Sequence, residues 1–132
     1  MRVVIYNIYQ LYRSVDTHGW RLNFKDWVGP NTETARAQDS ITTVDDDTWH
    51  YAVRCRRSGM LELYVDGVLT ATAPANAGPI VNAADLYIGR SGWQRYNGYI
   101  DEVQIRGVAP DPAWIRLAHE TQRPDQVVVT IR

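Results

Sequence analysis

The stretch from residue 48 to residue 106 decides the fold, because it contains four apolar runs: TWHYAV (48–53), LELYVDGVL (61–69), LYIGR (86–90) and GYIDEVQI (98–105). In the first run, inward and outward positions alternate with the two-residue period of a strand that buries one face. Asp66-Gly67 supplies residues that tolerate the positive φ of a tight hairpin turn. The runs therefore predict consecutive strands of an antiparallel β-sandwich. By this phase, the inward residues of the first run are Trp49, Tyr51, Val53 and Cys55, and the outward ones are His50, Arg54 and Arg56.

Length and composition bound the domain organisation and the class of partner. The chain has 132 residues, which suffices for one domain with one core, so we expect a single domain over residues 1–132. The net charge is -1 and the pI about 6.3, so no overall field favours nucleic acid. No run approaches the roughly 20 apolar residues that span a bilayer, and we expect no membrane insertion. The start MRVVIYNIYQ lacks the apolar core of a signal peptide.

The flanks of the central stretch predict more strands and one short helix. Strands are expected at residues 3–12 (bent near residue 7), 18–24, 34–44 (one strand or a pair of strands), 68–73, 86–90, 99–106 and 127–131. Asp111-Pro112 is a typical helix start, with a capping carboxylate followed by proline at the first helical position. Trp114, Leu117 and Ala118 fall on one face of that helix, which we expect to close one end of the sandwich. The phases of Trp20, Trp49 and Trp114 assign these residues to the core.

The order of these motifs resembles the laminin-G-like members of the concanavalin A-like lectin and glucanase superfamily. In that family a Trp-His pair opens a central strand, here Trp49 and His50, and a Tyr-Val-Asp-Gly hairpin follows, here residues 64–67. An Ile-Gly-Arg strand at 88–90 and a Gly-x-Ile-Asp-Glu-Val strand at 98–103 then precede the short helix. The resemblance implies an all-β jelly-roll sandwich with one short C-terminal helix, an extracellular location, and binding of a glycan or a cell-surface ligand.

The N-terminal end departs from the family pattern. Family members carry several dozen residues before the strand that we expect at 18–24, whereas this chain has about 17. Either residues 1–12 replace the missing strands or the sandwich has an exposed edge. Exposed edges invite pairing with another chain, so we expect a homodimer completed by sheet edges.

Carboxylates and cysteine argue against catalysis. Superfamily glucanases place paired acids at even spacing on one strand, whereas Asp101 and Glu102 are adjacent and face opposite sides of a strand. The phase points Asp101 inward, where it would accept backbone N–H bonds, and leaves Glu102 solvated. Cys55, the single cysteine, also points inward and would act as a small apolar residue rather than as a nucleophile. We therefore expect no enzymatic activity.

The spacing of acids, histidines and arginines in the sequence gives little support for a metal or phosphate site. Calcium, which lectin-like sandwiches often hold, needs six to eight oxygens from several segments, and the consecutive acids at 45–47 are better explained as a solvated turn. The three histidines, His18, His50 and His119, have no zinc-ligand spacing. The arginines at 54, 56 and 57 favour a solvated strand face over a phosphate site. We expect no metal and no cofactor.

The loop at residues 90–97 is the strongest candidate for a binding site. Sugar recognition uses flat aromatic rings beside polar groups that bond hydroxyls. Trp93 could stack on a sugar or fold back onto the core, and Trp27 in the loop at 27–31 has the same two options. The sequence predicts a non-catalytic module that binds carbohydrate through this loop or the concave sheet; the alternative is an interaction module that assembles through a sheet edge. The predicted carbohydrate-binding residues are Trp93, Tyr96, Asn97, Arg90 and Trp27.

Overall fold

The computed structural model describes residues 2–6, 10–16, 19–27, 33–38, 48–75, 88–91, 94–95 and 98–125. A five-stranded sheet has the order β10-β1-β5-β6-β7 and forms the middle of the structure. Its strands are β1 (Arg2–Tyr6), β5 (Tyr51–Arg57), β6 (Met60–Val65), β7 (Val68–Pro74) and β10 (Asp101–Arg106). Strands β5, β6 and β7 form an antiparallel meander, as the central stretch of the sequence predicts.

Two smaller sheets and one helix complete the described part of the chain. An antiparallel sheet contains β2 (Gln10–Asp16), β3 (Gly19–Trp27) and β4 (Glu33–Gln38). A short ribbon contains β8 (Arg90–Ser91) and β9 (Gln94–Arg95), and the helix is α1 (Pro112–Gln122). The strand expected at residues 127–131 lies outside the described residues.

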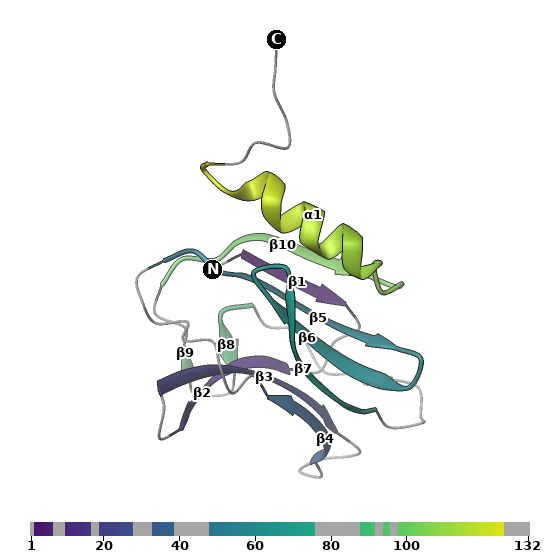
Figure 1. The fold of residues 1–132 in the computed structure, drawn as a ribbon. Helices are drawn as coiled ribbons and strands as arrows, with labels where there is room; N and C mark the ends of the chain where they lie inside the picture. The colour runs from purple at the N-terminus through teal and green to yellow at the C-terminus, as the bar shows by residue number, and fades with distance from the viewer. Residues whose placement is uncertain are drawn as a thin grey trace.

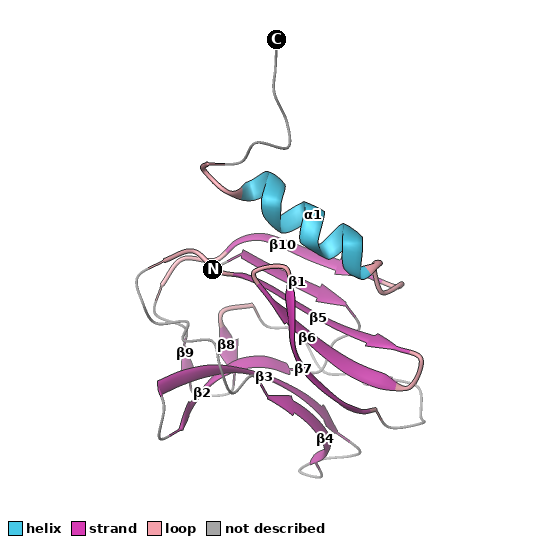
Figure 2. Ribbon diagram, viewed as in Figure 1, coloured by secondary structure: helices cyan, strands magenta, loops and turns pink. Residues whose placement is uncertain are grey.

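The five-stranded sheet lies between α1 on one face and the three-stranded sheet on the other (Figures 1 and 2). Strand β4 contacts β6 and β7. Helix α1 therefore covers a face of the sheet, and the expectation that it closes one end of the sandwich is wrong.

Both faces of β5 are buried, which corrects the prediction of a half-buried strand. On the helix side Tyr51, Val53 and Cys55 form a core cluster with Tyr64 and Ile115. The residues of the opposite cluster come from three strands: Ala37, Ala52, Leu61, Leu63 and Val65. The sequence pattern failed here because it assumes one covered face, whereas a central strand between two layers has two.

The sequence predicts that Arg54 of β5 and His50, just before β5, face outward. Both are buried instead, because both faces of this strand are covered. Arg54 is 1% exposed and His50 is 8% exposed. Burial disfavours the charged guanidinium and lowers the pKa of Arg54 to about 9. The interpretation of Arg54 as part of a solvated strand face is therefore wrong.

The N-terminal segment supplies one strand to each large sheet. The sequence predicts one bent strand over residues 3–12, but β1 joins the five-stranded sheet and β2 joins the three-stranded one. Residues 7–9 connect them. Strand β1 runs parallel to both of its neighbours, β5 and β10.

Helix α1 begins as the sequence predicts but buries a different face. The Oδ1 atom of Asp111 accepts a hydrogen bond of 2.7 Å from the backbone N–H of Ala113, and Pro112 is the first helical residue. Ile115 is fully buried, whereas Leu117, predicted on the buried face, is 48% exposed. Trp114 and Ala118 are partly buried against the core, in agreement with the prediction.

A β-bulge at the start of β10 changes the direction of its side chains. Arg2 pairs with Asp101 and Val4 with Gln104, so three steps along β10 match two along β1. Glu102 has φ 51°, the left-handed conformation found at the first position of one class of bulge. Asp101 is exposed and its Oδ1 accepts a 2.8 Å bond from the N–H of Glu102, so the prediction of an inward Asp101 is wrong.

Candidate binding surface

The loop predicted at residues 90–97 contains a short β-ribbon. Arg90 pairs with Arg95 and Ser91 with Gln94, antiparallel. The strand predicted at 86–90 is confirmed only at Arg90, because Ile88 and Gly89 form a bend, and residues 86 and 87 lie outside the described residues. The other predicted binding residues of this loop, Trp93, Tyr96 and Asn97, also lie outside them.

Trp27 belongs to a strand rather than to the loop in which the sequence places it. It is the last residue of β3 and pairs with Glu33 of β4 across a register shift. Residues 28–31 of the predicted loop lie outside the described residues.

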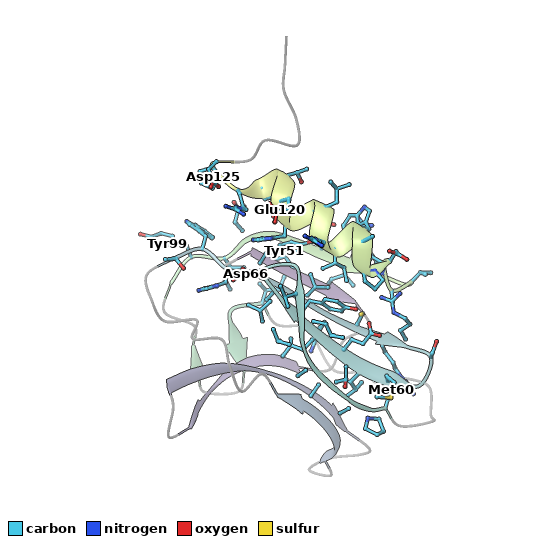
Figure 3. All side chains as sticks on the ribbon, viewed as in Figure 1. Tyr51, Met60, Asp66, Tyr99, Glu120 and Asp125 are labelled. Carbon is cyan, nitrogen blue, oxygen red and sulfur yellow. The ribbon has the colours of Figure 1, made fainter. Side chains whose placement is uncertain are left out.

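The structure brings together two exposed aromatic residues that the sequence did not assign to a site. Trp49 is 56% exposed and Tyr99 is 80% exposed, with their ring centroids 6.5 Å apart and their planes at 39°. Tyr99 lies outside the sheet, at its left side in Figure 3. The assignment of Trp49 to the core is wrong because β5 begins only at Tyr51, so the strand period does not extend back to residue 49.

The ends of the predicted loop converge beside this aromatic pair. A Cβ atom built on Gly89 would lie 3.4 Å from Cδ1 of Ile100, so the residues on either side of the loop are in contact at its base. Tyr99 precedes Ile100 directly. The aromatic surface of Trp49 and Tyr99 therefore adjoins the base of the loop at residues 90–97.

A partly buried hydrogen-bond network anchors the backbone next to Trp49. His50 Nδ1 lies 2.8 Å from Asp66 Oδ2, and His50 Nε2 lies 3.1 Å from Thr48 Oγ1. The backbone N–H of Tyr51 donates to Asp66 Oδ1 at 2.9 Å, and the N–H of Asp66 donates to the carbonyl of Tyr51 at 2.8 Å. The hairpin turn between β6 and β7 thereby fixes the residues that flank Trp49.

The same carboxylate lies close to α1. His119 Nε2 is 3.9 Å from Asp66 Oδ1, and the His119 ring stacks on Tyr51 with centroids 6.1 Å apart. Burial alone would raise the pKa of Asp66, but the hydrogen bonds from His50 and from the Tyr51 backbone outweigh it and lower this pKa. Figure 3 shows Asp66 and Tyr51 beneath the helix.

A second network surrounds Glu62 on the helix side of the sheet. Its Oε2 atom accepts from Tyr64 Oη at 3.0 Å, Arg57 Nε at 3.1 Å and Cys55 Sγ at 3.2 Å. Arg57 also donates to the carbonyl of Pro110, just before α1. Burial, followed by the bond to Glu62, raises the pKa of Cys55 to about 12. The thiol is therefore protonated at neutral pH, in agreement with the prediction of a buried cysteine that is no nucleophile, but it donates to a carboxylate and so does not act purely as an apolar residue.

The two acids predicted to be non-catalytic have separate partners. Oδ1 of Asp101 accepts a hydrogen bond from the backbone N–H of Glu102. Oε2 of Glu102 accepts a hydrogen bond of 3.0 Å from Nε2 of Gln122 in α1. In the part of the chain that the structure describes, no group of three His, Cys, Asp or Glu side chains could hold a metal ion. His18 and the acids at 45–47 lie outside it. Within that part, α1 is too short and too polar to cross a membrane.

Comparison with known proteins identifies the family. No curated protein and no solved structure matches the chain. The laminin-G-like family model, described as concanavalin A-like lectin/glucanases superfamily, matches residues 2–126. That superfamily implies a β-sandwich, and its description covers both sugar-binding proteins and glucanases. The match extends over nearly the whole sequence, and the chain therefore belongs to the laminin-G-like family of the concanavalin A-like lectin/glucanases superfamily.

Proposed function

We propose that the chain is a single, non-catalytic jelly-roll module that binds a glycan on the aromatic surface of Trp49 and Tyr99, together with the loop at residues 90–97. The observation that carries the proposal is the exposed aromatic pair, with centroids 6.5 Å apart. Exposed Trp and Tyr rings offer apolar faces with a polar tip, the combination that suits the faces and hydroxyls of a sugar. Membership of a superfamily that includes lectins is consistent with this ligand class.

The loop would supply the polar contacts and a third ring. It contributes Arg90, Trp93, Tyr96 and Asn97, and its base adjoins Tyr99. A few polar groups beside apolar rings are what fixes the orientation of a small ligand. Trp27, in the other sequence-predicted loop, stays a secondary candidate for the same ligand.

The way in which the described acids Glu62, Asp101 and Glu102 are bonded supports a non-catalytic role. A glycosidase flanks the scissile bond with two carboxyl groups separated by roughly 5–9.5 Å. Here the adjacent Asp101 and Glu102 bond the backbone and Gln122, and Glu62 holds three donors of the core. These arrangements support a binding role over hydrolysis.

A glycan array with the full chain tests the proposal. We expect Trp49→Ala, Tyr99→Ala and Trp93→Ala each to weaken glycan binding by about 30-fold or more, the effect of removing an aromatic anchor. Val68→Ala serves as the control, because Val68 is also exposed, at 63%, but lies on β7. Melting temperatures should stay close to that of the parent protein in all four variants. If the parent protein binds no glycan on a broad array, the proposal is wrong. If the Trp49 and Tyr99 variants bind with unchanged affinity, the surface of these two residues is not the binding site.

A further inference from the structure

We propose that the ligand of the Trp49–Tyr99 surface is a curled chain of hexose sugars, such as an α-linked glucan of the maltose type, with neighbouring sugar units lying on the two rings. This inference rests on the proposed function and adds to it the length and the shape of the glycan. It depends on three properties of the pair: the 6.5 Å between the ring centroids, the 39° between the ring planes, and the exposure of both residues.

The spacing of the two rings excludes a single sugar held between them. A sugar in contact with both ring faces needs two van der Waals separations of about 3.5–4.0 Å, and therefore near-parallel planes at least about 7–8 Å apart. The centroids of Trp49 and Tyr99 are closer than this, at 6.5 Å, and the planes are tilted by 39°. The distance instead falls in the range of aromatic rings in direct contact, about 4.5–7 Å. The two rings are therefore neighbours in one surface and not the walls of a slot.

The exposure of the two residues indicates that the rings do not cover each other. Tyr99 is 80% exposed, a value that is too high for a ring with one face stacked on the indole. Trp49 is 56% exposed, so a large part of the indole also faces solvent. A hexose ring and a phenol ring each contain six ring atoms, so one sugar matches one ring face in size. Two open rings side by side therefore offer contact area to two neighbouring sugars of a chain.

The tilt between the rings selects the shape of that chain. A sugar that stacks on an aromatic ring lies roughly parallel to it, so two bound sugars would be inclined by the same 39°. In a β-linked glucan of the cellulose type the chain is a flat ribbon, whereas in the α-linked glucan each sugar turns against the one before it. Glucose suits both rings, because its hydroxyls lie around the rim and leave C–H groups to contact an aromatic face. The tilted pair therefore fits the α-linked chain better than the flat one.

The two rings have different supports, which assigns them different roles. The backbone next to Trp49 is fixed by the bonds of Asp66 to His50 at 2.8 Å and to the Tyr51 N–H at 2.9 Å. An anchor that is fixed in advance loses less entropy on binding. Tyr99 lies outside the sheet, in the segment just before β10, and is the more exposed of the two (Figure 3). We therefore assign the first sugar to Trp49 and the second to Tyr99.

NMR titration of the full chain with glucose, maltose, maltotetraose and cellotetraose tests the inference. We expect maltotetraose to bind about 30-fold more tightly than glucose, the gain from a second aromatic contact, and more tightly than cellotetraose. Maltose should already show most of this gain, because two sugars span both rings. Tyr99→Ala should remove the gain and leave the affinity for glucose at the parent value, whereas Trp49→Ala should weaken the binding of both sugars.

Two further variants serve as controls. Tyr99→Phe keeps the ring without its hydroxyl and should keep the gain with chain length, which separates stacking from hydrogen bonding. Val108→Ala shortens another side chain that is 80% exposed and should change neither affinity. Melting temperatures should stay close to that of the parent protein in all of these variants, because the replaced side chains lie at the surface.

Several results would overturn the inference and leave the proposed function standing. These are equal affinity for glucose and maltotetraose, an equal loss of both in Tyr99→Ala, loss of the gain in Tyr99→Phe, and tighter binding of cellotetraose than of maltotetraose. Binding of other glycans on the array without binding of any glucan would have the same meaning. A parent protein that binds no glycan at all would overturn the inference and the proposed function together.

Discussion

Asp66 and His50 are joined by a 2.8 Å contact between a carboxylate in the β6–β7 turn and an imidazole just before β5. The same carboxylate accepts the Tyr51 backbone N–H at 2.9 Å and lies beside His119 of α1. One side chain therefore connects a hairpin turn, the start of a central strand and the helix.

Replacing Asp66 with asparagine should destabilise the protein by about 2 kcal/mol near neutral pH, the range for hydrogen bonds to a charged group. The folded-state pKa of Asp66 is lowered, so its contribution is complete above the unfolded pKa of about 3.9 and is lost as the pH falls through the lower folded value. The free energies of unfolding of the two proteins should therefore converge between about pH 5 and pH 2. Urea titrations at several pH values measure this. A constant difference at all pH values would show that the charge of Asp66 is unimportant.

Gly67 and Gly59 offer a matched pair of alanine substitutions. Both have positive φ, 78° and 76°, so each alanine should cost about 1–2 kcal/mol of backbone strain. A Cβ on Gly67 would in addition lie 3.3 Å from Cα of Arg116 and from the His119 side chain, whereas a Cβ on Gly59 would meet nothing within 4 Å. Thermal melting should show a larger loss for Gly67→Ala. Equal losses would mean that the helix moves freely away from the turn.

Ile115→Ala should destabilise the protein by about 2–5 kcal/mol, because it opens a cavity between the helix and the sheet. Leu117→Ala, two residues away on an exposed position, should change the free energy of unfolding by less than about 0.5 kcal/mol. Their exposures of 0% and 48% underlie this contrast. Chemical denaturation of both variants measures the two changes in the free energy of unfolding. If Leu117→Ala cost as much as Ile115→Ala, the helix would pack on the sheet through a different face from the one described.

Cys55 should resist alkylation by iodoacetamide at pH 8 in the folded protein and react fully in denaturant. With its pKa raised to about 12, only about one thiol in ten thousand would be ionised at that pH. Thr72→Cys provides an exposed thiol for comparison. Mass spectrometry over time distinguishes the two sites. Fast labelling of Cys55 in the native protein would contradict its place in the core.

The sequence predicted the meander best, because its signals are local. Alternation of Leu61, Leu63 and Val65 and the turn at Asp66-Gly67 depend on nearest neighbours, and the structure confirms them. The same holds for the Asp111-Pro112 helix start.

The errors at Trp49, Arg54 and Asp101 have non-local causes. Trp49 precedes its strand, Arg54 lies under a second layer that periodicity cannot reveal, and Asp101 is turned by a bulge at Glu102. Tyr99 escaped notice because only the fold brings it to Trp49. The residues predicted in the loop, Trp93, Tyr96 and Asn97, await the binding experiment.

Strand β1 has a consequence for how the chain folds. It lies between β5 and β10, so it joins residues 2–6 to a strand about a hundred positions later in the sequence. Contacts of such long range form slowly, because the entropy of closing the intervening loop is lost before the contacts are gained. The β5–β6–β7 meander is local and should form early. Folding should therefore be limited by the pairing of β1 with β10, and a nascent chain can pair β1 with β5 but should hold the other side of β1 unpaired until β10 has been synthesised.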